Sequence, residues 1–256
     1  MAHLPSAARR ADERARGRTD PRPEGGGLHH ARPHELKTAL VTGAARGIGR
    51  AAADALRKAG CKVIGLDREQ ADVVYDLTNI AGIAAMAEKL GAIDILVNNA
   101  GVQTAVSIDK YTEEARRRIL AVNLEAPVEL IRAVSKQMVA RGSGRIVNLA
   151  SIAAYTAHTD LWYGVTKAGV VSFTRSFAAQ LGPHGIQVNA VAPGPIDTPL
   201  LDKAQPERVD ELMKKVYTRR KGRPDEIAEA IRWLALDAPP ILNGAILDVT
   251  DGSFLR

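Results

Sequence analysis

The sequence predicts an α/β protein whose parallel sheet is covered by helices on both faces. From residue 37 onward, short runs rich in β-branched residues alternate with longer helical stretches. The runs are nearly all apolar, which is typical of strands buried on both faces of a sheet. A glycine-rich loop joins the first run to the first helix, as in dinucleotide-binding folds. These observations favour seven strands, over residues 38–43, 61–67, 71–77, 93–101, 144–151, 186–194 and 245–252.

Helical stretches lie between most of the runs, as expected for parallel strands joined by crossover helices. One connection departs from this pattern. Only three residues, "REQ", separate the second and third runs, whereas a parallel crossover usually takes a dozen or more. Either a tight loop replaces the helix there, or the third run is not a strand. The helices are expected near residues 47–59, 79–90, 112–141, 163–181, 206–217 and 224–236.

Residues 1–36 differ in composition from the rest of the chain. They are rich in Arg, Pro, Gly and His and nearly lack large apolar residues. Such a segment cannot bury enough apolar surface to offset the entropy lost on ordering. We therefore interpret residues 1–36 as a disordered extension and residues 37–256 as one domain.

Composition excludes several classes of protein. A single cysteine, Cys61, rules out an intrachain disulfide framework, and no stretch of 18 apolar residues predicts a membrane span. The net charge is +6, of which the first 36 residues carry +2, from seven Arg against five acidic residues. No basic helix, zinc pattern or stacking-aromatic motif accompanies this charge. We expect a cytoplasmic protein without a metal site, a nucleic-acid partner or a membrane partner.

The segment "TGAARGIGRAAADAL" carries three spaced glycines between a strand and a helix. Glycine lets the backbone turn sharply and approach a pyrophosphate, which then lies at the positive end of the helix. The alternative is a loop that only starts the helix and binds no ligand. The three glycines are Gly43, Gly47 and Gly49.

Asp67 ends the second strand, 18 residues beyond Gly49. A carboxylate there accepts hydrogen bonds from the adenosine ribose hydroxyls and repels a 2′-phosphate, which favours NAD over NADP. Arg46 and Arg68 point the other way, because either could pair with a phosphate. We expect NAD, with NADP as the alternative.

Several motifs together resemble the short-chain dehydrogenase/reductase family and occur in its order. The resemblance covers residues 38–253. The motifs are "TGAARGIG" (42–49), "DLT" (76–78), "NNAG" (98–101), Asn123, Ser151, "YGVTK" (163–167) and "PGPIDT" (193–198).

The resemblance implies a doubly wound sheet of seven parallel strands, Rossmann-like, in a homotetramer or homodimer. It implies a catalytic set of Asn123, Ser151, Tyr163 and Lys167. The short link after Asp67 departs from the family and would trim the adenine side. The implied cofactor-binding residues are Gly43, Arg46, Gly47, Ile48, Gly49, Asp67, Asp76, Leu77, Asn98, Ala100, Gly101, Tyr163, Lys167, Pro193, Gly194, Ile196 and Thr198.

Tyr163 and Lys167 lie one helical turn apart and therefore on one side of a helix. A free tyrosine has a pKa near about 10, too high for a base at neutral pH. A nearby ammonium, together with an oxidised nicotinamide, favours the tyrosinate and lowers that pKa. Ser151 is expected to orient the substrate oxygen, and Asn123 to hold a water that links Lys167 to solvent. Alone, each of these residues has an ordinary structural interpretation; together they predict hydride transfer.

Residues 195–222 are expected to cover the substrate as a lid. Its basic part, "MKKVYTRRK", suits an acidic substrate or a phosphopantetheine carrier, but we favour a solvated face. His158 and Trp162 are either pocket residues or loop residues. The expected apolar inner face is Leu200, Leu201, Met213 and Val216.

The favoured function is an NAD-dependent oxidoreductase that interconverts a secondary alcohol and a ketone. One alternative is an NADPH-dependent reductase of 3-oxoacyl thioesters, which Arg46 and the basic lid would suit. A more distant alternative is a dinucleotide-binding regulator without activity, which would predict a broken catalytic set.

Overall fold

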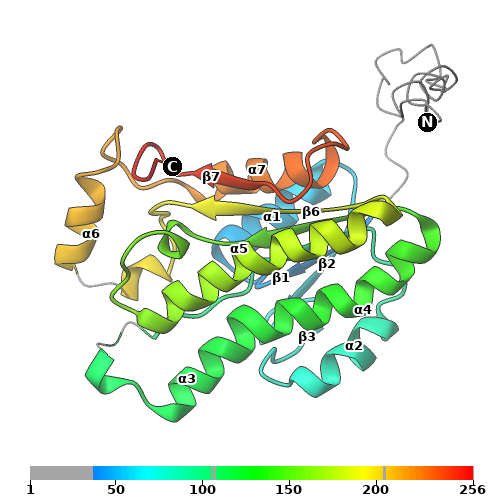
Figure 1. The fold of residues 1–256 in the computed structure, drawn as a ribbon, viewed down its shortest axis with the longest axis horizontal. Helices are drawn as coiled ribbons and strands as arrows, with labels where there is room; N and C mark the ends of the chain where they lie inside the picture. The colour runs from blue at the N-terminus through cyan, green and yellow to red at the C-terminus, as the bar shows by residue number, and fades with distance from the viewer. Residues whose placement is uncertain (1–36, 105, 107, 204–205, 256) are drawn as a thin grey trace, which may run out of the picture. The chain divides into compact units, whose positions relative to one another are not determined.

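The computed structural model describes residues 37–104, 106, 108–203 and 206–255, so the expected disordered extension, 1–36, lies outside the described residues. Seven parallel strands form one sheet in the order β3-β2-β1-β4-β5-β6-β7 (Figure 1). This is the predicted doubly wound arrangement. The strands are β1 (Thr38–Thr42), β2 (Lys62–Asp67), β3 (Val73–Val74), β4 (Ile95–Asn98), β5 (Gly144–Leu149), β6 (Ile186–Pro193) and β7 (Ile246–Val249).

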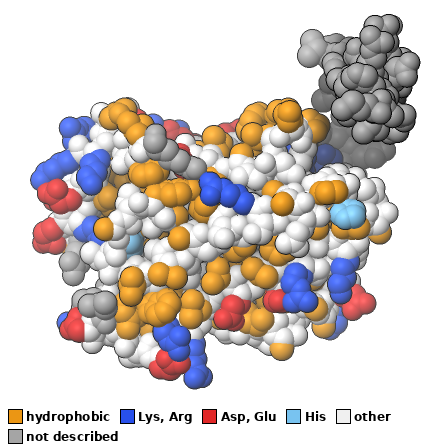
Figure 2. Space-filling view, in the orientation of Figure 1, with side chains coloured by type: hydrophobic (Ala, Val, Ile, Leu, Met, Phe, Trp, Pro, Cys, Tyr) orange, Lys and Arg blue, Asp and Glu red, His pale blue; other side chains and the backbone are white. Residues whose placement is uncertain are grey.

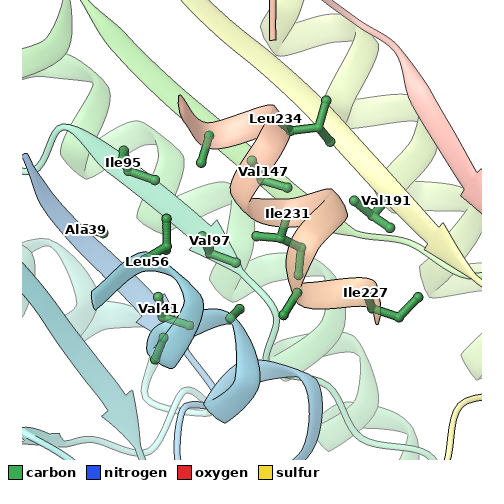
Figure 3. Close-up of a cluster of buried hydrophobic side chains, with 14 of the residues drawn as sticks. Ala39, Val41, Leu56, Ile95, Val97, Val147, Val191, Ile227, Ile231 and Leu234 are labelled. Atoms are coloured by element: carbon green, nitrogen blue, oxygen red, sulfur yellow. The ribbon is translucent and has the colours of Figure 1, made fainter. Parts of the chain in front are cut away.

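Helices pack on both faces of the sheet because each face presents a continuous apolar surface. On one face, Leu56 of α1 and Ile231 of α7 pack over Val97 and Val147 (Figure 3). On the other, α2, α4 and α5 cover a second cluster around Leu96. The helices are α1 (Gly47–Lys58), α2 (Ile83–Lys89), α3 (Glu113–Leu120), α4 (Ala126–Arg141), α5 (Leu161–Leu181), α6 (Pro206–Met213) and α7 (Pro224–Leu236). Among the described residues, no helix is long and apolar enough to cross a membrane.

The link between β2 and β3 is a tight loop, and the third run is a strand of only two residues. Leu66 pairs in parallel with Val73, and Asp67 with Val74. Gln70 takes a left-handed conformation at φ 53° within the loop. The Asp72 carboxylate accepts a hydrogen bond from Gly65 N at 2.7 Å. The Asp72 side chain thus accepts the hydrogen bond from β2 that a longer β3 would accept through its backbone.

The predicted helix over 112–141 is interrupted by a π-helical turn, η4 (Ala121–Glu125), between α3 and α4. Asn123 lies within this turn and is buried. Single π turns inside α-helices occur frequently at functional sites. The turn therefore marks the part of the helix that faces the cavity described next.

Candidate active site

A cavity of about 380 Å³ opens at the carboxyl ends of the strands. This is where parallel α/β sheets bind their ligands. Loops that follow β1, β2, β4, β5 and β6 form its walls, so residues far apart in sequence meet there. The predicted residues on its wall are Gly43, Arg46, Gly47, Ile48, Asp67, Asp76, Leu77, Ala100, Gly101, Ser151, Tyr163, Lys167, Pro193, Gly194, Ile196 and Thr198.

Three predicted residues lie behind this wall. Gly49 is buried, and a Cβ placed on it would stand 2.1 Å from the carbonyl oxygen of Gly43. Asn98 is buried in the sheet, where its Nδ2 donates to Asn148 Oδ1 at 2.9 Å. Asn123 is also buried. These three residues support the wall and do not form it.

The glycine loop has the shape that a pyrophosphate requires. Gly43 and Gly47 have positive φ angles of 69° and 56°, which side chains disfavour. No side chain caps the start of α1, so its first backbone N–H groups are available to an anion. The residues present therefore fit a dinucleotide cofactor.

Asp67, the last residue of β2, holds the glycine loop in place. Its Oδ2 accepts from Ala45 N at 3.0 Å, and its Oδ1 accepts from Arg68 N at 2.7 Å. A carboxylate accepts about four hydrogen bonds, so both oxygens keep capacity for ribose hydroxyls. Arg46 and Arg68 line the same part of the cavity. The local charges thus leave both nicotinamide dinucleotides possible on electrostatic grounds.

Tyr163 and Lys167 are both buried on the inner side of α5, with exposed fractions of 8% and 5%. Lys167 Nζ donates to the carbonyl oxygen of Leu149 at 2.6 Å and lies 5.6 Å from the centre of the Tyr163 ring. Ser151 Oγ accepts from Ala153 N at 3.1 Å, which directs its own proton elsewhere. The three side chains line one cavity.

Burial dominates the titration of this pair. It raises the pKa of Tyr163 to about 12; a hydrogen bond with Ser151 acts against this rise and the charge of Asp160 adds to it. Burial also lowers the pKa of Lys167 to about 8. The expected lowering of the Tyr163 pKa by Lys167 is therefore not found in the protein by itself. At pH 7 the residues are a neutral phenol and an ammonium.

Asn123 fastens the loop after β4 to the cavity. Its Oδ1 accepts from Val102 N and its Nδ2 donates to Val102 O, each at 2.8 Å. Nδ2 also donates to Thr166 Oγ1 at 3.2 Å. A Cβ on Gly101 would lie 3.6 Å from Asn123 Oδ1 and 3.7 Å from Lys167 Nζ, so both atoms face the same small space. The role of Asn123 in holding a water stays a prediction.

Asp160 is a site residue that the sequence analysis did not identify. It caps α5 and accepts from Tyr163 N at 3.1 Å. It also accepts from Thr104 N at 2.6 Å, from Thr104 Oγ1 at 2.7 Å and from the Tyr111 hydroxyl. Asp before a helix is an N-cap signal, but its partners lie about fifty residues away in sequence. No local pattern could have revealed them.

The segment 195–222 contributes to the cavity through Leu200 and Leu201, as expected. Met213 and Val216 are absent from the wall, and Leu212 lies there instead. Gln103 Nε2 donates to the carbonyl oxygen of Leu200 at 2.7 Å, which joins this segment to the loop after β4. Three residues of its basic part, "MKKVYTRRK", form exposed ion pairs, as a solvated face would: Lys214 with Glu211, Arg220 with Glu226, and Lys221 with Asp197.

Other residues line the cavity without having been predicted. Asn99 belongs to the "NNAG" motif, and its Nδ2 donates to Thr42 O at 2.9 Å. Arg118 from α3 and Arg208 from α6 also reach the wall. His158, which was expected either in the pocket or in a loop, lies on the wall too. The two arginines come from amphipathic helices, in which the sequence gives no sign of an inward cation.

Comparisons with known proteins agree with this geometry. The family model described as enoyl-(acyl carrier protein) reductase matches residues 43–253. The chain is 33% identical over 240 residues to 3-oxoacyl-[acyl-carrier-protein] reductase FabG of Vibrio cholerae, which covers 86% of this chain and 98% of the relative.

Two solved structures show the same fold. A gluconate 5-dehydrogenase of Burkholderia cenocepacia, in complex with NADP and tartrate, is 32% identical with a TM-score of 0.79, over 85% of this chain and 94% of that one. A 3-oxoacyl-[acyl-carrier protein] reductase of Brucella melitensis with bound NAD is 32% identical with a TM-score of 0.79, over 88% and 93%. The chain therefore belongs to the short-chain dehydrogenase/reductase family of Rossmann-fold, nicotinamide-dependent oxidoreductases that act on CH–OH groups.

Proposed function

We propose that the protein interconverts a secondary alcohol and a ketone, with Tyr163 as the acid and base. The observation that carries this proposal is the convergence of Ser151, Tyr163 and Lys167 on one cavity wall, beyond a glycine loop shaped for a pyrophosphate. A regulator without activity would have no need to bury a lysine beside a tyrosine, because burying a charge is costly.

The chain's own groups handle the proton and the charge. In the reducing direction, neutral Tyr163 donates its phenolic proton to the ketone oxygen. The Lys167 ammonium then stabilises the tyrosinate that remains, because opposite charges attract strongly in a buried site. Ser151, whose Oγ already accepts from Ala153 N, donates to the same substrate oxygen. A bound nicotinamide cofactor supplies or accepts the hydride.

The test of Tyr163 is its replacement by phenylalanine. Tyr163→Phe removes only the hydroxyl, so we expect turnover to fall by about 10²- to 10⁴-fold, the usual contribution of a general acid. Cofactor binding, measured by NADH and NADPH fluorescence, should stay near the wild-type value. Tyr217→Phe is the matched control, because Tyr217 is exposed. Turnover that survives in Tyr163→Phe contradicts the assignment.

We propose NAD as the preferred cofactor, because Asp67 lies where a 2′-phosphate would meet its charge. The similar structures hold either NADP or NAD, so family membership alone leaves the choice open. Parallel fluorescence titrations with NADH and NADPH decide it. A lower dissociation constant for NADPH overturns the assignment of Asp67.

A second candidate is an NADPH-dependent reductase of 3-oxoacyl thioesters. The similarity to the Vibrio cholerae reductase favours it, as do Arg46 and Arg68 beside Asp67. Acetoacetyl-CoA is a convenient probe. Reduction of this thioester with NADPH, at a higher kcat/KM than for simple ketones, would make this the function.

We also propose a homodimer or homotetramer. Hydrophobic side chains spread over the face that α4 and α5 present in Figure 2. Val139, Leu161 and Val165 from these helices are exposed, at 36%, 45% and 45%. Exposed apolar side chains on one face of a protein favour an interface with another molecule. Light scattering measures the mass directly, and a monomer at micromolar concentration contradicts the proposal.

A further inference from the structure

The arginines on the cavity wall fall into two groups. Arg68 and Arg118 lie at the nucleotide end, where their charges act on Asp76. Arg208, on α6, lies at the other end, where its charge acts on His158. The His158 ring centre is 5.0 Å from that of Tyr163. Arg208 is therefore a cation of the substrate end and not of the nucleotide end.

Arg208 is held in place but has no acid of its own. Its Nη1 donates to Thr159 Oγ1 at 2.7 Å, which fixes the half-buried guanidinium against the start of α5. Within the described part of the chain, no carboxylate lies within 4.0 Å of it. By contrast, Arg220 on the outer side of the same segment pairs with Glu226.

Asp160 is the acid whose negative charge acts on Arg208, but its carboxylate oxygens accept hydrogen bonds from other residues. It is buried and accepts hydrogen bonds from Thr104, Tyr111 and Tyr163. A guanidinium has five N–H donors in a fixed fork, so Arg208 keeps donors for a ligand after its contact with Thr159.

His158 adds a polar but uncharged group beside this cation. Its Nδ1 lies 3.1 Å from both the backbone N and the backbone O of Asp160, so Nε2 is the ring nitrogen left for a ligand. Burial, and then the charge of Arg208, lower the pKa of His158. The ring is neutral at pH 7 and suits a hydroxyl.

We propose that Arg208 binds a carboxylate of the substrate, so that the enzyme acts on hydroxy acids and oxo acids in preference to neutral alcohols and ketones. The planar fork of arginine matches a carboxylate with two parallel hydrogen bonds. Leu200 and Leu212 line the wall as well, which suits a carbon chain between the carboxylate and the reacting carbon. The inference rests on the proposed function, because it names the substrate class of that site.

Two pairs of compounds that differ only in the carboxylate test the proposal. They are d-gluconate with d-glucitol, and 3-hydroxybutyrate with 3-hydroxybutyramide. In the wild type, kcat/KM should favour the acid of at least one pair. Arg208→Gln should lower kcat/KM for that acid about 10- to 100-fold, the usual effect of a hydrogen bond to a charged group. The neutral partner should change less than about twofold.

Lys215→Gln is the matched control, because it removes one positive charge from the same segment at an exposed position. It should leave both members of each pair unchanged. An equal loss in Lys215→Gln, an unchanged ratio of acid to neutral compound in Arg208→Gln, or a wild-type preference for the neutral compounds overturns the proposal.

Calorimetric titration of the four compounds into the enzyme with reduced cofactor separates this proposal from the function itself. Acids that bind more tightly to the wild type than to Arg208→Gln support it even without turnover. Equal binding to both proteins overturns it. Turnover of the neutral compounds without preference leaves the proposed function standing while the carboxylate site fails.

Discussion

Asp160 accepts a hydrogen bond from the backbone amide of Tyr163 at 3.1 Å, which joins a buried carboxylate to the residue assigned as acid and base. The same carboxylate binds Thr104 from the loop after β4 and Tyr111 before α3. The position of Tyr163 therefore depends on segments about fifty residues away. This arrangement makes Asp160 a positioning residue whose removal should affect both stability and turnover.

Replacement of Asp160 by asparagine tests this dependence. An amide offers one acceptor oxygen, and its NH₂ group would face donors, so buried donors lose their partner. We expect Asp160→Asn to lower the free energy of unfolding by about 2–3 kcal/mol and to reduce kcat. Urea denaturation measures the first effect. Asp210→Asn, on the exposed side of α6, should change neither quantity.

The pH dependence of the same variant gives a second check. Burial raises the pKa of Asp160, but hydrogen bonds from Tyr111, Thr104 and Tyr163 outweigh it, and the net pKa is lowered. In the unfolded chain this carboxyl has a pKa of about 3.9. Because its pKa is lower in the folded protein, its charge stabilises the fold above the unfolded pKa, and this stabilisation is lost as the pH falls through the folded pKa. Wild type and Asp160→Asn should differ most above pH 4 and converge below it.

Lys167 should leave a distinct mark on stability at alkaline pH. Burial lowers its pKa to about 8, whereas the unfolded chain holds that proton up to about pH 10.4. Between these pH values the amine of Lys167 is protonated only in the unfolded state. The free energy of unfolding of the wild type therefore rises with pH, by at most about 1.4 kcal/mol per pH unit. Lys167→Met lacks this gain. Urea denaturation from pH 7 to 10 compares them, and parallel curves contradict the burial of a titrating amine.

Gly49 should tolerate no side chain. A Cβ there would stand 2.1 Å from Gly43 O and 2.4 Å from Asn99 Nδ2. Gly49→Ala should therefore distort the loop, cost about 1–3 kcal/mol of stability and weaken cofactor binding. Gly101→Ala is the comparison, because its Cβ meets atoms only at 3.6 Å and beyond. Wild-type cofactor affinity in Gly49→Ala would show that the close packing of the loop is dispensable.

Asp67→Asn should move the two cofactors in opposite directions. Loss of the charge weakens hydrogen bonds to ribose hydroxyls and removes the repulsion of a 2′-phosphate. We expect the ratio of NADH to NADPH affinity to fall about tenfold. No separate control variant is needed. If the loss of the hydrogen bonds to Ala45 and Arg68 distorted the loop, the affinities for NADH and NADPH would fall by the same factor. A ratio equal to that of the wild type excludes a role for Asp67 in selection.

The sequence was sufficient for those elements that depend on local pattern. All seven apolar runs are strands, and the loop from Gly43 to Gly49 lies between β1 and α1 as expected. The Tyr163–Lys167 pair shares one buried side of α5 because helical spacing places it there. These features follow from the spacing of apolar residues and from the backbone freedom of glycine, both of which can be read from one short segment of sequence.

Features that depend on distant contacts were not predictable in the same way. The third run spans seven residues in the sequence, but the edge strand keeps only Val73 and Val74, and Asp76 and Leu77 beyond it line the cavity. The rise in the Tyr163 pKa reflects burial that no motif reports. The guanidinium of Arg208 donates to Thr159, which lies 49 residues earlier in the sequence. In each case the deciding partner lies elsewhere in the chain.

The π turn at Ala121–Glu125 also sets the angular phase of a long helix. A π turn acts as an insertion of one residue into the run from Glu113 to Arg141, and one residue corresponds to about 100° of rotation. α3 thus presents Ile119 to the interior and Glu113 and Arg117 to solvent, with a phase that a straight helix would not give. Removing one residue from the turn would move Arg118 into the position of Ile119, which is fully buried, so the length of this segment is itself under structural constraint.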